Sequence, residues 1–526
     1  MAAKTRPPVD LRPLFENFEE VGPVECEITG HLPPWLSGTL LRNGPGTFKI
    51  GDSEYHHWFD GLAYIRRYHF ENGKMTYTAK HLKSNTYKVN HAANRIVIGE
   101  FGTAAYPDPC KNIFQRFFSF FEEKTFTDNG LVNFVQCGDR VFATTETPFM
   151  TEVDLETLDT KERLNLSDYV ALNTATAHHH YDADGNIFNV GSKFGKGGEY
   201  VFARTDNGKA DAFKNTSKIT SIPMNSALHP SYYHSFGMTE NHLVLFECPL
   251  TMNVWKIMVA KLRGQSFLHT MEWDPSTPVN VHIVNRETGE PFALKVKSSA
   301  FFTFHHANSY EKDGHLVLDY CKIRDGNVVK GFTLEQMREG MIKTTNPDEM
   351  ATLHRMVVPL KLPEVKDDGK NLLENVDFAQ GCKAFYKEDG CLWVEDAELC
   401  EIPMELPRYN YAFNTKPYKY CYGTVLQMED RTGILKVNVA EKTHEMWRND
   451  NPEQLSAEPV FVADPNGENE DDGVLLCPII SVNKDQNPFM LVLNASNMTE
   501  LARCHVPHMI PLGFHGHFVG QKPEEA

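Results

Sequence analysis

Short apolar runs separated by turn residues follow one another along most of the chain. The runs at 64–69 and 75–79, for example, flank the sequence Glu71-Asn72-Gly73. An Asn-Gly pair accepts the positive φ angles that tight hairpin turns require. This stretch is therefore predicted to form two antiparallel strands joined by a turn.

The same order of turn and apolar run recurs downstream. Asp-Gly or Thr-Gly pairs precede apolar runs at 187–190, 316–320, 392–395 and 434–439. Helical periodicity is confined to a few segments, and the strand pairs follow one another without crossover helices. The pattern predicts an all-β protein and excludes a doubly wound α/β fold.

The number of predicted strands narrows the architecture. A two-sheet sandwich of 526 residues would be unusual, whereas a β-propeller arranges many small antiparallel sheets radially with few exposed edges. We therefore predict a β-propeller, with a large two-sheet β protein as the alternative. The repeats are too degenerate for the number of blades to be read from the sequence.

Composition removes one class of partner. Lys and Arg number 52 against 70 Asp and Glu, which gives a formal net charge of −18 with neutral histidines. A nucleic-acid groove needs a basic surface, so nucleic acid is not an expected partner. Hydrophobic residues make up 41% of the chain, which is enough for a large core.

The cysteines and the N-terminal segment bear on location. Eleven cysteines occur singly, without a C-x-x-C pair, so reduced cytosolic thiols are expected rather than a zinc ribbon or a complete disulfide framework. The N-terminal segment lacks the apolar core of a signal peptide. No stretch approaches the ~20 apolar residues of a membrane-spanning helix. We therefore expect a cytoplasmic protein whose membrane contact, if present, is peripheral.

Three histidines occupy similar positions relative to predicted turns: His178, His234 and His305. Each lies seven or nine residues before the Gly or Asn of a turn that an apolar run follows. A fourth candidate, His515, is predicted at the end of a final strand where the chain could close the ring. Residues at equivalent points of successive blades point toward one axis, so these histidines could converge on one metal ion.

The chemistry of such a site remains open at this point. Four neutral imidazoles suit an iron ion with open octahedral positions, although Zn, Cu and Ni also bind imidazole. Chance is the competing interpretation, because 23 histidines yield coincidental spacings. The sequence lacks H-E-x-x-H, G-x-S-x-G and G-x-x-x-x-G-K-S/T motifs, so zincin, serine-hydrolase and P-loop chemistry are without their usual markers.

Eight short sequence blocks are spread over nearly the whole chain: LRNGPG (41–46), HWFDG (57–61), EFGT (100–103), PDPCKN (107–112), SYYHSFG (231–237), FHH (304–306), EP (458–459) and FHG (514–516). In sequence and in order, these blocks resemble the carotenoid cleavage oxygenases, in particular the animal branch that contains the β-carotene oxygenases and the retinoid isomerohydrolase.

The resemblance implies one domain over residues 1–526, folded as a seven-bladed β-propeller under a helical and loop cap, with Fe(II) on its axis. By motif, the iron ligands are His178, His234, His305 and His515. Three glutamates are implied to accept hydrogen bonds from ligand imidazoles, which fixes the tautomer: Glu146, Glu405 and Glu458. Taken singly, each of these glutamates would be interpreted as a solvated surface charge.

One position departs from the family pattern. Relatives usually carry His-Pro-His at the first ligand, whereas this chain has His178-His179-His180. The fixed φ of proline is lost there. The motif still assigns His178 as the ligand and makes His179 and His180 bystanders.

Two segments carry apolar faces that the resemblance places at a membrane, near the mouth of the substrate tunnel. The segment near 107–125 has helical spacing of its apolar residues: Ile113, Phe114, Phe117, Phe118 and Phe121. The segment near 249–264 has a second set: Trp255, Ile257 and Met258. Taken alone, the first segment would be interpreted as a core helix. An apolar face flanked by basic side chains binds a bilayer without spanning it, so peripheral membrane contact is expected.

The resemblance implies an Fe(II)-dependent dioxygenase that uses O₂ to split a carotenoid double bond into two aldehydes. Central cleavage of β-carotene to retinal is preferred, because the sequences at 304–308 and 405–411 are most similar to central cleavers. Eccentric cleavage and isomerising hydrolysis of retinyl esters are the alternatives. A non-enzymatic carotenoid or lipid carrier is a hypothesis of a different class, against which four intact candidate ligands argue, since a carrier has no need of iron.

Overall fold

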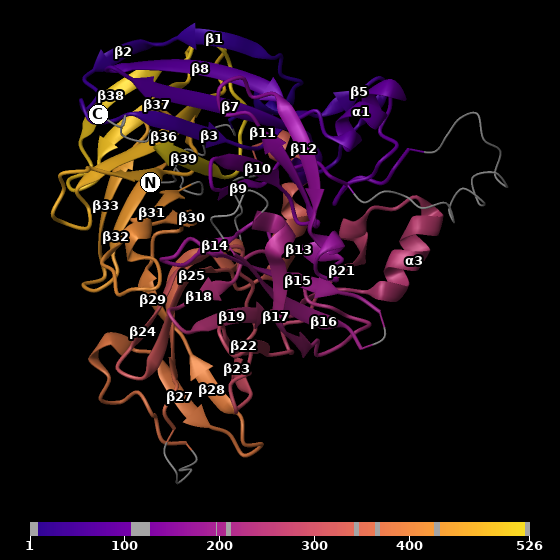
Figure 1. Cartoon of the computed structure of the whole chain (residues 1–526), viewed down its shortest axis with the longest axis vertical. Helices are drawn as coiled ribbons and strands as arrows, with labels where there is room; N and C mark the ends of the chain where they lie inside the picture. The colour runs from indigo at the N-terminus through magenta and orange to yellow at the C-terminus, as the bar shows by residue number, and fades with distance from the viewer. Residues whose placement is uncertain are drawn as a thin grey trace, which may run out of the picture.

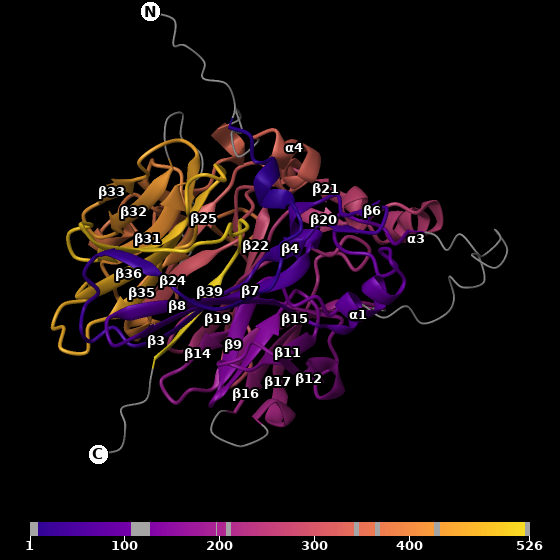
Figure 2. The same cartoon turned by 90° about the horizontal axis from the view of Figure 1, so that it is seen from above.

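The computed structural model describes residues 9–106, 127–195, 197–206, 212–340, 347–362, 369–425 and 432–520. Within these ranges, seven sheets of four to six strands surround one axis as a seven-bladed β-propeller (Figures 1 and 2). Two further pairs of strands form small ribbons, β5 (Lys49–Ile50) with β6 (Ser53–Glu54) and β20 (Leu250–Met252) with β21 (Met271–Trp273). The prediction of an all-β propeller is confirmed.

In blades 1, 2, 3 and 7 the strands follow one another from the propeller axis outward. Blade 1 contains β39 (Gly516–Gly520), β3 (Gly38–Arg42), β7 (Leu62–Glu71), β8 (Lys74–His81) and β1 (Val21–Glu25), with β4 (Pro45–Thr47) paired to β7. Blade 2 contains β9 (Asn133–Cys137), β10 (Arg140–Thr144), β11 (Phe149–Val153) and β12 (Thr160–Asn165). Blade 3 contains β13 (Thr174–Ala175) and β14 (His180–Tyr181), then β15 (Ile187–Lys193), β16 (Glu199–Thr205) and β17 (Thr216–Pro223). Blade 7 contains β34 (Gln454–Ser456) and β35 (Val460–Ala463), then β36 (Gly473–Ser481), β37 (Phe489–Asn494), β38 (Glu500–His505) and β2 (Glu27–Gly30).

The other three blades follow the same plan. Blade 4 contains β18 (Gly237–Met238), β19 (His242–Glu247), β22 (Val279–Asn285) and β23 (Val296–Ser298), and is extended by β28 (Leu392–Glu395) and β27 (Lys383–Tyr386). Blade 5 contains β24 (His306–Lys312), β25 (His315–Lys322), β26 (Thr352–Pro359) and β29 (Ala397–Cys400). Blade 6 contains β30 (Glu405–Arg408), β31 (Tyr420–Val425), β32 (Gly433–Asn438) and β33 (Thr443–Arg448).

Both ends of the chain close the ring. The last strand, β39, pairs with β3, and β2 pairs with β38, so N-terminal strands complete blades 1 and 7 (Figure 1). His515 directly precedes β39, so the expectation that it ends the final strand is wrong. Because β39 is the innermost strand of blade 1, this position places His515 near the centre of the ring.

The predicted hairpin turns form for the expected reason. Asn72 and Gly73 have φ angles of 52° and 71°, and Asp313 and Gly314 have φ angles of 49° and 77°. Two consecutive positive φ angles give a turn whose twist matches that of the flanking strands. The pairs β7–β8 and β24–β25 are joined at these turns.

Helices are short and lie outside the blades. In the described ranges the α-helices are α1 (Asn85–Ala92), α3 (Val254–Arg263) and α4 (Leu334–Arg338). In both Figure 1 and Figure 2, α1 and α3 lie on the same side of the molecule. None of the helices in the described ranges is long and apolar enough to cross a membrane.

A half-buried carboxylate joins blades 4 and 5. Glu311, in β24, accepts hydrogen bonds from the Thr239 hydroxyl at 2.6 Å and from the backbone N–H and the side-chain amide of Asn241 at 3.0 and 2.9 Å. Its Oε1 also lies 3.0 Å from His242 Nδ1. Burial alone would raise the pKa of Glu311, but these partners lower it to about 2.

A Glu311→Gln substitution should make unfolding less dependent on pH. The pKa in the folded state lies below the ordinary value of 4.5, so the stabilisation by Glu311 is complete above pH 4.5 and is lost as the pH falls toward 2. We expect the free energy of unfolding of the wild type to exceed that of the variant by on the order of 2 kcal/mol at pH 7, and by less at pH 3.5. Urea unfolding at the two pH values measures this difference, and a difference independent of pH would contradict the prediction.

Candidate metal centre and substrate cavity

The four histidines singled out in the sequence lie at the inner edges of four blades. His178 lies between β13 and β14, His234 precedes β18, His305 directly precedes β24, and His515 directly precedes β39. These strands belong to blades 3, 4, 5 and 1. The radial arrangement therefore makes neighbours of residues that are far apart in the sequence.

The imidazole rings converge through their nitrogen atoms. His178 Nε2 lies 2.9 Å from His234 Nε2, and His305 Nε2 lies 3.1 Å from His515 Nε2. One ligand atom from each of the four histidines lies within 4.8 Å of the others. The site thus offers four nitrogen donors at one point.

Most of these rings are oriented by a carboxylate on the side away from the cluster. His234 Nδ1 lies 2.6 Å from Glu146, His305 Nδ1 lies 2.6 Å from Glu405, and His515 Nδ1 lies 2.8 Å from Glu458. A carboxylate accepts a hydrogen bond, so Nδ1 carries the proton and Nε2 keeps its lone pair for a metal. Among the described residues, His178 has no carboxylate partner.

The donor set fits a metal ion. With Nδ1 protonated, the Nε2 lone pairs of His305 and His515 face each other across 3.1 Å and repel each other. A cation between them removes this repulsion. Two nitrogens at ~2.1 Å from a metal and 90° apart would be separated by about 3.0 Å, close to both observed separations. Imidazole suits Fe, Zn, Cu and Ni, and four neutral donors leave open positions on an octahedral ion.

Burial favours the neutral form of His178, His305 and His515. It lowers the pKa of His515 to about 3, and Glu458 offsets this effect only in part. Burial, followed by the neighbouring histidines, holds the pKa of His178 and of His305 well below 6.5. Neutral imidazole is the form that binds a metal, so these groups need not lose a proton to become ligands.

Glu458 is held by several charged and polar groups. Its side chain is 1% exposed and accepts hydrogen bonds from Arg42 Nη1 at 2.7 Å, from Arg408 Nε at 2.8 Å and from the backbone N–H of Gly516 at 2.8 Å. Burial would raise the pKa of Glu458, but Arg408, His515 and Arg42 hold it well below its usual range. Glu458 is therefore a fixed anion beside His515.

Glu405 has a different environment. One carboxylate oxygen accepts the N–H of Leu406 at 2.7 Å and faces His305, while the other has no hydrogen-bond partner among the described residues. Burial raises the pKa of Glu405 to about 7, against the effect of the Leu406 N–H. The carboxylates around the cluster are thus not equivalent.

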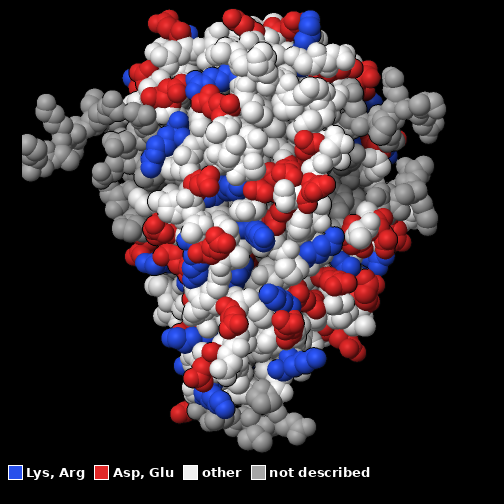
Figure 3. Space-filling view, turned by 90° about the vertical axis from the view of Figure 1, so that its left-hand side faces the viewer, with Lys and Arg blue, Asp and Glu red and all other residues white. Residues whose placement is uncertain are grey.

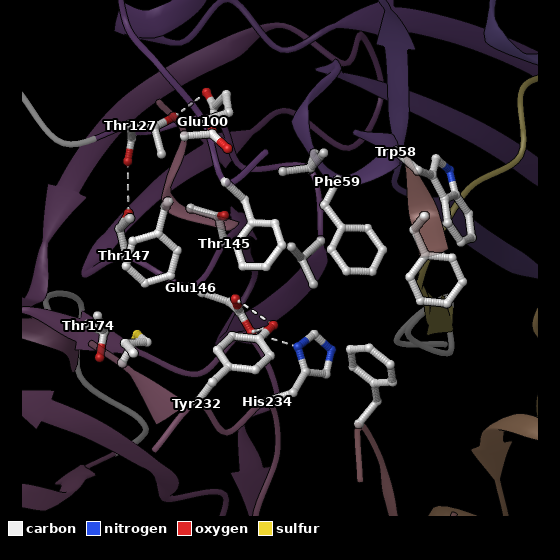
Figure 4. Close-up of a pocket in the computed structure, with 18 of the residues that line it drawn as sticks. Trp58, Phe59, Glu100, Thr127, Thr145, Glu146, Thr147, Thr174, Tyr232 and His234 are labelled. Atoms are coloured by element: carbon white, nitrogen blue, oxygen red, sulfur yellow. Dashed lines mark hydrogen bonds and ion pairs between the residues drawn. The ribbon is translucent and has the colours of Figure 1, made fainter. Parts of the chain in front are cut away.

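A cavity of about 930 Å³ opens beside the histidines, and His234, His305 and His515 contribute to its wall. One side of the wall is built of aromatic rings: Trp58, Phe59, Phe304, Phe332 and Phe514. Their ring centroids lie 4.8 to 6.3 Å apart in the contacting pairs. Figure 4 shows Trp58 and Phe59 on this side, with His234 and Glu146 below them. An aromatic lining of this kind suits an apolar ligand beside the histidine cluster.

Comparison with known proteins agrees with this arrangement. A family model described as "Retinal pigment epithelial membrane protein" matches residues 12–520. The chain is 39% identical to the "Carotenoid-cleaving dioxygenase, mitochondrial" of Mustela putorius furo, with 97% of this chain and 96% of the relative covered. It is also 39% identical to the Homo sapiens "Beta,beta-carotene 15,15'-dioxygenase", with coverage of 95% and 93%. The chain belongs to the carotenoid oxygenase family.

Solved structures show the same fold. A single-residue variant of Synechocystis apocarotenoid oxygenase superposes with a TM-score of 0.77 at 21% identity, covering 97% of this chain and 98% of that one. The cobalt-substituted Synechocystis protein gives a TM-score of 0.75 at 21% identity, with the same coverage. The likeness concerns the arrangement of the blades.

His179 and His180 lie outside the donor cluster of this carotenoid oxygenase. His179 Nε2 lies 2.9 Å from the side-chain amide of Asn189, and His180 Nε2 lies 3.0 Å from the carbonyl oxygen of Phe236. Burial lowers the pKa of His179 to about 3 and of His180 to about 4. Both rings are therefore neutral parts of the protein interior.

Three residues of the site were not singled out in the sequence. The Tyr232 hydroxyl donates to Glu146 at 3.0 Å, while Arg42 and Arg408 bind Glu458. Tyr232 and Arg42 fall within the SYYHSFG and LRNGPG blocks, which carried a family signal without indicating a partner. Arg408 follows Glu405 by three residues, and only the tertiary structure brings it to Glu458.

The two segments expected at a membrane have different outcomes. Ile113, Phe114, Phe117, Phe118 and Phe121 lie outside the described residues. The second segment begins as strand β20 and continues as the helix α3, which starts at Val254. On α3, Trp255 is 61% exposed, Ile257 lines the cavity, and the side chain of Met258 lies outside the described part of the structure.

Proposed function

We propose that this chain is an Fe(II)-dependent dioxygenase that cleaves a carotenoid double bond with O₂ into two aldehydes, and that it cuts the central bond of β-carotene to give retinal. One observation carries the proposal. Four imidazole donors converge at the wall of a cavity whose adjacent lining is aromatic. The names of the carotenoid dioxygenases at 39% identity support the substrate class.

The side chains prepare the site for this chemistry. His178, His234, His305 and His515 would hold Fe(II), which when bound activates O₂ at its open coordination positions. Glu146, Glu405 and Glu458 hold the proton of their imidazole partners on Nδ1 and leave Nε2 free to bind. Aromatic rings of the cavity exclude water and position the polyene. Specificity then depends on which double bond the cavity places beside the histidines.

The test is chromatography of the products formed from β-carotene in detergent by the iron-loaded protein, with and without O₂. Retinal as the sole product, formed only with O₂, is the expected result. A longer apocarotenal together with an ionone would show eccentric rather than central cleavage. Activity on retinyl esters alone would indicate the isomerohydrolase. A folded protein that binds carotenoid but no iron would favour the carrier.

We also propose that α3 docks on a membrane at the cavity mouth. Trp255 and Val259 on α3 are 61% and 44% exposed, and Phe194, which lines the cavity, is 38% exposed. Leu228, 49% exposed, accepts the N–H of Val254 through its carbonyl oxygen at 3.0 Å. An exposed apolar surface on a helix that also lines the cavity fits transfer of a water-insoluble substrate from a bilayer. The opposite face carries interspersed acidic and basic side chains (Figure 3).

A Trp255→Glu substitution should weaken binding to phospholipid vesicles about tenfold, because it replaces a large exposed apolar group by a charge that the bilayer interface repels. Co-flotation with vesicles measures the bound fraction. Tyr169→Glu is the matched control, since Tyr169 is an exposed aromatic residue, 36% exposed, outside α3. Equal loss of binding in both variants would contradict a docking role for α3.

A further inference from the structure

The cavity wall differs in polarity between its two sides. Trp58, Phe59 and Phe514 belong to the aromatic side, whereas Glu100 and Thr147 line the other. Figure 4 shows Glu100, Thr127 and Thr147 together, across the cavity from Trp58. A purely hydrocarbon ligand needs no such polar groups, so the polar side calls for a ligand with an oxygen atom.

The polar side is one hydrogen-bonded wall that starts at the metal centre. Thr147 directly follows Glu146, whose carboxylate faces His234. The Thr147 hydroxyl donates to the carbonyl oxygen of Thr127 at 2.9 Å, and the Thr127 hydroxyl donates to Glu100 Oε1 at 2.6 Å. The wall therefore connects the histidine cluster to a carboxyl group, and its length is fixed by these bonds.

Glu100 lines the cavity, and its burial favours the uncharged form of its carboxyl group. Burial raises the pKa of Glu100 well above 4.5, the Thr127 hydrogen bond opposes this, and the nearby Asp60 and Asp128 raise it further. Among the described residues, Thr127 is the only hydrogen-bond partner of the carboxyl group. A protonated carboxyl group both donates and accepts hydrogen bonds, so it retains capacity for one partner in the cavity.

This remaining capacity discriminates between ligands. A hydrocarbon ring packed against Glu100 would bury a polar group without a partner, whereas a ring hydroxyl would satisfy it. Leaving a buried polar group unsatisfied costs roughly tenfold or more in affinity. On the aromatic side, the ring of Phe59 contacts those of Phe332 and Phe514.

On the basis of the proposed function, we propose that Glu100 and the wall of Thr127 and Thr147 form a subsite for a hydroxylated carotenoid end ring. The hydroxyl binds Glu100, and the polyene passes the histidine cluster toward the aromatic side. Because the wall has a fixed length, the bound ring also fixes which double bond lies beside the metal centre. The chain then binds ring-hydroxylated carotenoids more tightly than β-carotene.

Equilibrium binding to the metal-free protein tests the subsite without depending on catalysis. Quenching of tryptophan fluorescence is measured with β-carotene and with its mono-3-hydroxy derivative in the same detergent. We expect the hydroxylated ligand to bind the wild type about tenfold more tightly. Glu100→Leu should bind both ligands equally, and Glu100→Gln should keep a preference, because an amide also donates and accepts hydrogen bonds.

Thr270→Val is the matched control. Thr270 also lines the cavity, but its hydroxyl donates to the carbonyl oxygen of Phe267 at 2.7 Å and is not part of the wall. This variant should keep the tenfold preference. Circular dichroism and thermal unfolding establish that each variant is folded, and the wild-type comparison of the two ligands stands even if Glu100→Leu does not fold.

The outcomes separate the subsite from the reaction. Equal affinities of the wild type for both ligands would overturn the inference, as would a preference that persists in folded Glu100→Leu. A tenfold preference without cleavage by the iron-loaded protein would support the subsite and contradict the proposed function. Cleavage of β-carotene without any end-ring preference would support the proposed function and contradict the subsite.

Discussion

A His305→Ala substitution should abolish metal retention at the propeller axis and lower carotenoid cleavage at least about a hundredfold. The substitution removes one of the four converging nitrogen donors. It also leaves Glu405 without its imidazole partner at 2.6 Å, although one oxygen of this carboxylate already lacks a hydrogen bond. Loss of a group that merely orients a ligand costs 10- to 100-fold in metal affinity or activity, and loss of the ligand itself should cost more.

Two measurements check this prediction together. Metal content per chain after dialysis should fall to background, and the chromatographic yield of aldehyde should fall in parallel. His315→Ala is the matched control, since His315 also belongs to blade 5 but bonds the carbonyl oxygen of Asp313 at 2.9 Å, away from the cluster. Full metal content in His305→Ala would exclude the four-histidine site.

Replacing Arg42 by leucine should destabilise the folded protein by about 3–5 kcal/mol. The Arg42 side chain is fully buried and pairs with Glu458 at 2.7 Å, and its Nη2 donates to the carbonyl oxygen of Phe514 at 2.8 Å. Removing one partner of a buried ion pair leaves the other charge in the interior, which is the source of the large cost. Glu458 would keep Arg408, so the loss should stay within this range rather than exceed it.

Urea unfolding of the metal-free protein measures the effect without a contribution from bound metal. Arg12→Leu is the control. Arg12 forms an exposed pair with Asp10, so this substitution should leave the unfolding midpoint unchanged.

Arg42 lies in β3, which pairs with the final strand β39 directly after His515. Metal retention should therefore fall together with stability. A change below about 1 kcal/mol in Arg42→Leu would contradict this account of a buried pair.

Local sequence chemistry predicted the elements of the fold. Asn72-Gly73 and Asp313-Gly314 mark hairpins because two adjacent residues there adopt positive φ angles. The number of blades could not be predicted in this way, since strands that pair across the ring, such as β2 with β38, carry no local signal. His515 was expected at the end of the final strand but lies before it. The final strand β39 is defined by its pairing with the N-terminal strand β3, and this long-range pairing also carries no local signal.

The candidate site was predictable only through its repeated positions and the family blocks. Three of the histidines could be named because each precedes a turn and an apolar run, and His515 because of its place near the final strand. The glutamates look like surface charges when taken singly. Arg42, Tyr232 and Arg408 had no signal that connected them with Glu458 or Glu146. Their contacts join different blades, across 50 to 416 positions of the sequence.

The sequence by itself determined an all-β chain with radial repeats and four histidines available to a metal. These properties follow from turn chemistry, apolar alternation and the spacing of residues within each repeat, all of which are local. The tertiary structure decided which imidazole faces which carboxylate, which carboxylate is held as an anion, and which side of the cavity is polar. Those properties depend on burial and on contacts between blades, because a side chain's neighbours across the axis are set by closure of the ring.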